Sequence, residues 1–188
     1  MLLWIILAVV AAVVVYAIAV FNRLVRTRQM ANEAWSGIDV QLKRRSDLVP
    51  NLVDTVKGYA AHERSVLEEV TALRGAARAL PSDDVAARAQ AEGALSAALG
   101  RLIALSENYP DLKASANFLG LQQQLSDLEN DIQMARRYYN GAVRNLNVLV
   151  QSFPSNLIAG VFGFAQRDYF ELSDATEGTV PQVELAPR

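Results

Sequence analysis

The sequence predicts an all-α protein in which an N-terminal transmembrane helix leads into an elongated antiparallel helical bundle. Three observations predict this fold. Residues 1–20 contain no charged side chain, apolar residues in the remaining chain recur at alternating steps of three and four, and Gly and Pro gather at a few places. The recurring spacing is typical of helices that bury one face. We expect three long helices and a short fourth one.

The apolar N-terminal stretch predicts a membrane anchor over residues 1–21. As a helix, residues 1–20 would extend about 30 Å, the thickness of the hydrocarbon core of a bilayer. A cleaved signal peptide is the alternative, because the run from Ala17 to Ala19 resembles a small-residue cleavage site. Signal peptides carry positive residues before a shorter apolar run, and none precedes this one. An anchor is therefore the favoured interpretation.

Three arginines follow the apolar stretch and predict its orientation. Arg23, Arg26 and Arg28 lie just beyond it, where basic side chains extend to the membrane interface or attract anionic headgroups. Because positive residues favour the cytoplasmic side, we expect the bundle in the cytoplasm and the N-terminus outside. The reverse orientation stays open, since some long domains are translocated despite such charges.

Breaks in the apolar repeat divide the body of the chain into helices. A first helix is expected from residue 35 to between residues 75 and 80, with a kink at Pro50, which lacks a backbone donor. Turn residues around Pro81 separate it from a second helix over residues 83–108. The third helix, over residues 111–153, has the most regular repeat, from Ala114 to Phe153, and must pack along its whole length against the first.

The remaining segments complete the predicted domain organisation. A short fourth helix over residues 155–166 is expected to cap one end of the bundle. Residues 22–172 would then form the bundle domain. Residues 173–188 lack apolar periodicity, and we expect a flexible tail there.

Two charged residues, Arg45 and Glu63, interrupt the apolar repeat of the first predicted helix. A buried charge needs a partner, so we expect both to pair with charges on a facing helix and to fix its register. A contact site for a partner protein is the alternative. The neighbouring Lys43 and Arg44 are expected on a solvated face, although they could touch an acidic partner or lipid headgroups.

Composition argues against several classes of function. The chain has no Cys and a single His, His62, which excludes thiolate and multi-histidine metal sites and leaves one possible histidine base. No cofactor is expected. A formal net charge of -2 gives no reason to expect nucleic-acid binding. We therefore predict a protein that is not an enzyme, and keep a hydrolase based on His62 and Glu63 as a competing hypothesis.

Several segments of the chain resemble the LemA family of bacterial membrane proteins. The resemblance is carried by EAWSGIDVQLKRRSDLVPNLVDTVKGYAAHE (33–63), ENYPDLKASANF (107–118), LENDIQMARRYYNGAV (128–143) and the aromatic residues Phe162, Phe164, Tyr169 and Phe170. It implies an anchored antiparallel bundle at the bacterial inner membrane with no catalytic residues. The family has no established biochemical role.

The resemblance also suggests which partners to expect. A non-enzymatic scaffold or adaptor is the leading hypothesis, and a regulatory partner of a membrane-embedded HtpX-type zinc protease is an alternative. A self-assembling membrane organiser is another, since some family members look linked to magnetosomes. The chain could form a homo-oligomer, because small residues in the apolar stretch allow helices to approach closely.

Overall fold

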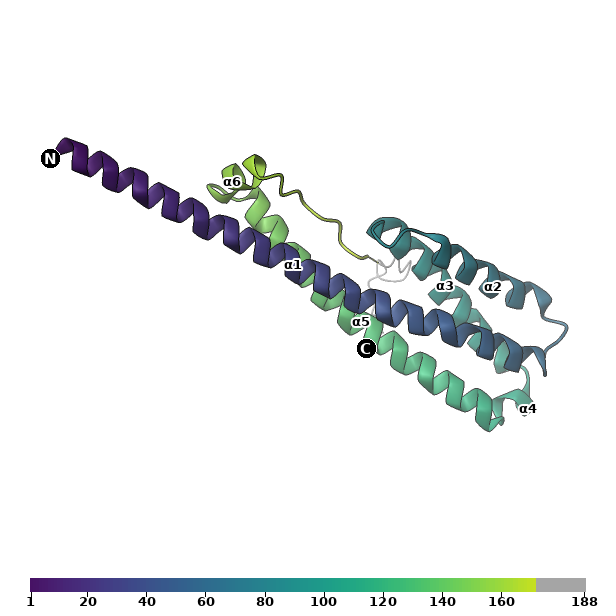
Figure 1. The fold of residues 1–188 in the computed structure, drawn as a ribbon. Coiled ribbons are helices and arrows are strands. Elements are labelled where there is room, and N and C mark those ends of the chain that lie inside the picture. Colours follow the sequence, from purple (N-terminus) through teal and green to yellow (C-terminus); the bar gives the residue numbers. More distant parts are fainter. Residues whose placement is uncertain (172–188) are drawn as a thin grey trace, which may run out of the picture.

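The computed structural model describes residues 1–171, which contain helices and no strand. In chain order the helices are α1 (Leu2–Lys57), α2 (Arg64–Ala79), α3 (Val85–Ser106), α4 (Pro110–Lys113), α5 (Ala116–Gln151) and α6 (Ser155–Val161). They form the elongated bundle of Figure 1, with the start of α1 projecting from one end. The predicted all-α fold class is confirmed. The tail predicted over residues 173–188 lies outside the described residues.

Helix α1 runs without interruption from the apolar stretch into the bundle. Its 56 residues extend about 84 Å at 1.5 Å per residue. Pro50 lies inside the helix and does not break it. The first burial occurs at Val20, and nearly all of the preceding side chains are exposed. Among the described helices, α1 is the one long and apolar enough to cross a membrane.

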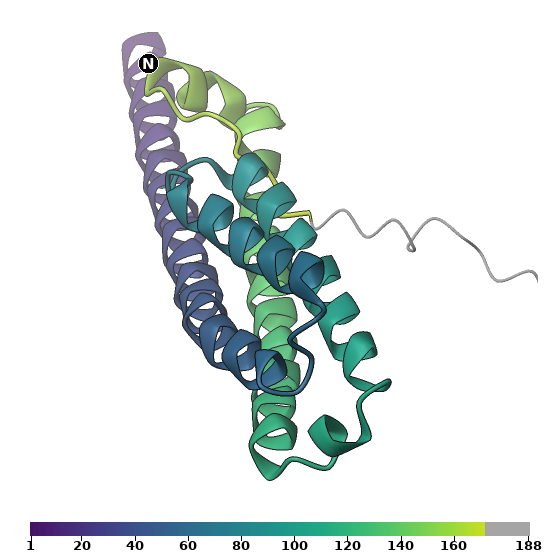
Figure 2. The same cartoon turned by 90° about the vertical axis from the view of Figure 1, so that its right-hand side faces the viewer.

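Helix α5 runs antiparallel to α1 and is its main packing partner (Figures 1 and 2). In the middle of the pair, Ile38 and Leu42 of α1 pack with Ile132 and Tyr139 of α5 in one buried cluster. Each helix contributes one apolar stripe at the three-four spacing, as expected for antiparallel neighbours. The α1–α5 pair is therefore the framework on which the other helices pack.

The chain reverses direction at residues 58–63, where the sequence predicted a continuous helix to residue 75 or beyond. Helix α2 returns beside α1, and Arg74 Nε donates a hydrogen bond to the Ser46 carbonyl oxygen at 2.5 Å. That expectation was wrong because the apolar repeat continues through the turn. Val56 before it and Val70 after it face the same core, so the spacing alone could not reveal the reversal.

Helices α2 and α3 form a hairpin on one side of the α1–α5 pair, as Figure 2 shows. The second predicted helix, over residues 83–108, corresponds closely to α3. The hairpin and the far ends of α1 and α5 enclose the largest apolar cluster, which includes Leu52, Leu102 and Phe118. This core stabilises the end of the bundle farthest from the exposed start of α1.

The fourth helix is shorter than predicted, because α6 ends at Val161 rather than near residue 166. Gly163 follows with a φ of 68°, a left-handed conformation that glycine adopts readily and that ends helices. Residues 165–171 then run as an irregular segment, here called the strap, back along α5. Helix α6 itself packs beside α1 and α5, at the end of the bundle nearest the apolar stretch.

Truncation of a core leucine tests this packing. Leu42 is 1% exposed and Leu119 is 49% exposed. We expect Leu42→Ala to lower the free energy of unfolding by about 2 to 5 kcal/mol, because it removes buried methyl groups and leaves a cavity. Leu119→Ala, the matched control, should change it by less than about 1 kcal/mol. Urea unfolding of the full chain in detergent micelles, followed by circular dichroism, measures both. Equal losses would contradict the packing described here.

Candidate functional site

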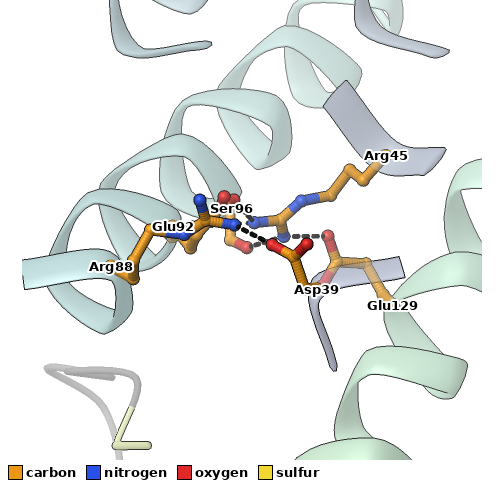
Figure 3. Close-up of polar contacts among 6 residues, drawn as sticks. All are labelled: Asp39, Arg45, Arg88, Glu92, Ser96 and Glu129. Carbon is orange, nitrogen blue, oxygen red and sulfur yellow. Dashed lines mark hydrogen bonds and ion pairs between the residues drawn. The ribbon is translucent and has the colours of Figure 1, made fainter. Parts of the chain in front are cut away.

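A buried arginine joins three helices at the centre of the bundle (Figure 3). Arg45 of α1 is 0% exposed. Its Nη2 lies 2.5 Å from Glu92 Oε2 of α3, and its Nη1 lies 2.6 Å from Glu129 Oε1 of α5. The guanidinium also donates to Ser96 Oγ at 2.5 Å and to the Glu92 carbonyl oxygen at 3.2 Å. Four hydrogen bonds, two of which are also ion pairs, therefore surround one cation.

A second arginine forms an ion pair beside Arg45. Arg88 Nη2 of α3 is 2.7 Å from Asp39 Oδ1 of α1, and the Arg88 side chain is mostly buried. Arg88 and Glu92 are four residues apart on α3, so both project from one face toward α1. We call Asp39, Arg45, Arg88, Glu92, Ser96 and Glu129 the charge cluster (Figure 3).

The charge cluster pairs carboxylates with arginines inside the bundle. Its carboxylates are used by arginines, and no residue of it is a histidine or cysteine. Within residues 1–171, no group of three or more His, Cys, Asp or Glu side chains is arranged to hold a metal ion. The cluster can hold α1, α3 and α5 at fixed heights relative to one another, because a shifted helix would leave a charge without its partner.

The other predicted contact residues lie apart from the cluster. Lys43 and Arg44 are exposed on α1 and form no ion pair with residues 1–171. Glu63 lies in the turn before α2, not on a facing helix, and accepts a hydrogen bond from Tyr109 Oη at 3.1 Å. The structure thus separates the four residues: Arg45 is internal, and the other three are at the surface or in a turn.

The possible hydrolase pair, His62 and Glu63, lies in the same turn. His62 is exposed and Glu63 is partly exposed. The hydrogen bond to Glu63 raises the pKa of Tyr109, with smaller contributions from burial and from the Glu63 charge. The hydrogen bond between Tyr109 and Glu63 joins the turn between α1 and α2 to the start of α4.

The three arginines after the apolar stretch differ in their surroundings. Arg23 and Arg26 are exposed on α1. The Arg28 guanidinium carbon lies 4.8 Å from the centroid of the Phe164 ring, within the range of a cation–π contact. All three are therefore close to the level at which α1 enters the bundle.

Two asparagines on α5 hold the strap, a feature that the sequence analysis did not identify. Asn147 Nδ2 donates to the Arg167 carbonyl oxygen, and Asn147 Oδ1 accepts from the Arg167 N–H, both at 2.9 Å. Asn140 does the same for Phe170, at 3.2 and 2.9 Å. Asn140 and Asn147 are seven residues apart on a helix, and Arg167 and Phe170 are three residues apart on an extended segment. Each separation is about 10 Å, so the two asparagines line up with the two strap residues. The seven-residue spacing of the asparagines was the available signal.

Aromatic residues complete the strap's attachment. The Trp35 ring centroid lies 5.3 Å from that of Tyr139 and 5.6 Å from that of Phe170. Tyr139 Oη donates to the Asp168 carbonyl oxygen at 3.0 Å, and burial raises the pKa of Tyr139. A surface hollow of about 420 Å³ lies beside these residues, between the strap and the loop that carries Ser82. Trp35 Nε1 donates to the Ser82 carbonyl oxygen at 2.6 Å and fixes that loop.

Comparison with known proteins identifies the family. The LemA family profile matches residues 34–185, which include the charge cluster and the strap. The chain belongs to the LemA family. The resemblance inferred from the sequence is thereby confirmed. With an N-terminal helix suited to crossing a membrane, the chain is a membrane-associated member of this family.

Named relatives are similar over most of their length. Magnetosome protein MamQ of Magnetospirillum gryphiswaldense is 27% identical over 195 residues, which cover 89% of this chain and 72% of the relative. Magnetosome protein MamQ 2 of Paramagnetospirillum magneticum is 26% identical with the same coverage. Protein LemA of Metamycoplasma hominis is 26% identical over 164 residues, covering 87% of this chain and 74% of the relative.

Removing the central arginine should destabilise the bundle strongly. We expect Arg45→Met to lower the free energy of unfolding by about 3 to 5 kcal/mol, because Glu92 is left buried without its cation. Arg44→Met changes the neighbouring exposed arginine and should alter stability by less than about 0.5 kcal/mol. Chemical unfolding of the two full-length variants, followed by circular dichroism, compares them directly.

A combined variant tests whether the stability lost in Arg45→Met comes from a buried charge without a partner or from lost packing. Arg45→Met with Glu92→Met and Glu129→Gln removes the cation and both partners, so no buried charge is left alone. This variant should recover most of the stability lost in Arg45→Met. If it stays as unstable as the single variant, buried charge is not what Arg45 controls.

The strap has its own test. Asn140→Ala removes both hydrogen bonds to Phe170 and should speed hydrogen exchange of the Phe170 amide. The exposed Asn145, on the same helix, is the matched control, and Asn145→Ala should leave that exchange rate unchanged. Hydrogen exchange with mass spectrometry on the full chain in micelles measures both. Unchanged protection in Asn140→Ala would mean that the other contacts of the strap hold Phe170 without Asn140.

Proposed function

We propose that this chain is a non-enzymatic scaffold or adaptor that holds a rigid helical surface at a fixed position relative to a bacterial inner membrane. One observation carries the proposal. Helix α1 continues from an exposed apolar segment into the bundle core without a break. In this proposal residues 1–21 are the anchor and residues 22–172 the bundle domain.

The bundle's internal contacts support a scaffold role. Its buried polar groups bind other parts of the same chain: Arg45 joins three helices, and Asn147 holds the strap. A site for chemistry would instead present reactive groups to a cleft with perturbed pKa values. The exposed surface, by contrast, carries charges such as Lys43 and Arg44 that remain available to a partner protein.

Self-assembly into a membrane organiser is the second candidate. It is favoured by three similar proteins that are named magnetosome proteins and by the small residues in the apolar segment, where Ala8, Ala11 and Ala12 are exposed. Small residues let membrane helices approach closely. Regulation of an HtpX-type zinc protease rests on the family resemblance and is an outcome that the same experiment would detect.

Affinity purification of the full chain in a mild detergent, with mass determination of the complex, tests the proposal. We expect the chain at a fixed ratio to one other protein. A membrane zinc protease as that protein would favour the regulatory role, and a homo-oligomer of defined size would favour the membrane organiser. A monomer that retains no partner at any protein concentration would contradict all three interpretations.

Orientation can be tested separately, because the chain has no cysteine of its own. We propose that Arg23, Arg26 and Arg28 keep the bundle in the cytoplasm. Leu119→Cys, at an exposed position of α5, should then resist a membrane-impermeant maleimide in spheroplasts and react after lysis. A cysteine added ahead of Met1, outside the proposed span, should react in intact spheroplasts. The opposite pattern would place the bundle outside the cytoplasm.

A further inference from the structure

The outward face of α6 is apolar, although it projects away from the bundle. Four large side chains at and beside α6 are exposed: Phe153 (79%), Leu157 (60%), Val161 (79%) and Phe162 (56%). The opposite face, with Ser155 and Ala159, is buried against the bundle. A short surface helix in water would carry polar residues on its outer face. We call these four side chains the α6 patch.

The segment around the patch has no charge. Between Arg144 and Arg167 the sequence contains no Asp, Glu, Lys, Arg or His. Helix α6 itself has one exposed polar side chain, Asn156. Charged side chains are costly where a segment meets acyl chains. Their absence here lets the large apolar side chains of the patch enter the layer below the headgroups without burying a charge.

Helix α6 lies at the level where α1 leaves the proposed membrane span. The Phe162 ring centroid is 4.8 Å from that of Phe21, and the Phe164 ring centroid is 5.8 Å from it. Val20, the first buried residue of α1, packs in the same cluster as Ala159. Figure 1 shows α6 at the end of the bundle beyond which α1 continues alone. The patch is therefore continuous with the surface that would face the bilayer.

Three arginines lie near α6, at the end of the bundle from which the apolar part of α1 projects. Arg23 and Arg144 line a surface hollow of about 300 Å³ beside Leu149, and Arg28 stacks on Phe164. Arginines near an apolar patch can reach the phosphates of lipid headgroups while the apolar side chains enter the layer below. Charge and apolar surface are thus arranged as a membrane interface requires.

We propose that the α6 patch inserts into the headgroup boundary of the same membrane that α1 crosses, so that the protein contacts the bilayer at two points. The proposal rests on the proposed anchoring by α1. A single spanning helix leaves the bundle free to rotate about its axis and to tilt. A second contact through α6, which packs on both α1 and α5, restricts both motions and decides which face of the bundle is turned away from the membrane.

Depth-dependent fluorescence quenching tests the proposal on the full chain. Single cysteines replace Leu157, Val161, Leu119 or Val10, each carrying an environment-sensitive fluorophore, in nanodiscs of phosphatidylethanolamine and phosphatidylglycerol. Leu119 matches Leu157 in type and is also exposed, but it lies about 48 Å from the α6 end of α5. Because all four positions are exposed, labelling should preserve the fold, and circular dichroism checks this.

We expect L157C and V161C labels to shift to the blue and lose most of their emission to lipids with a nitroxide near the headgroup. L119C should be quenched by aqueous iodide alone, and V10C by lipids with a nitroxide deep in the acyl chain. If L157C and V161C respond to iodide and not to lipid nitroxides while V10C is quenched deeply, the α6 contact is overturned and the anchor stands. Protection from both quenchers assigns the patch to protein and also overturns the proposal. If V10C escapes the deep nitroxide, the anchor and the α6 contact both fail.

Discussion

The backbone of one helix, α1, has to be stable both in hydrocarbon and in a water-exposed bundle. A helix pairs its backbone donors and acceptors internally, so it can pass from hydrocarbon into water without leaving any of them exposed to lipid. Helix α1 uses this property: its first residues present apolar side chains on all sides, and from Val20 onward one face is buried by α5 and α6. Because α1 is unbroken, an anchor formed by its first residues, as proposed, would give everything packed on α1 from Val20 onward a defined height above the membrane.

The apolar stripes of the bundle do not by themselves fix that height. Stripes built on a three-four repeat can pair again after a shift of seven residues, with similar burial. The charge cluster removes this ambiguity, because Arg45 meets Glu92 and Glu129 in a single register. The paired asparagines act likewise on the strap, which must align Arg167 and Phe170 with Asn147 and Asn140. Polar contacts thus select one arrangement among several that the apolar core would accept.

The sequence predicted the features that depend on local pattern. The all-α fold, the apolar span and α3 follow from composition, periodicity and turn residues, and Arg45 was conspicuous as a charge at an apolar position. The reversal at residues 58–63 escaped notice because Val56 and Val70 keep the repeat across it. Glu92 and Glu129 could not be selected from the many charged helix residues without the register of three helices. The strap has no periodicity at all, so only its tertiary contacts define it.

The most direct test of the account is the distance between the membrane span and the bundle along α1. Spin labels on cysteines replacing Val14 and Val40, both exposed, can be measured by double electron–electron resonance on the full chain in nanodiscs. A continuous helix separates these positions by about 39 Å along its axis, and the account predicts one narrow distribution near that value. A broad distribution, or one centred well below it, would mean that α1 bends between the two, and the bundle would then not be held at a fixed position.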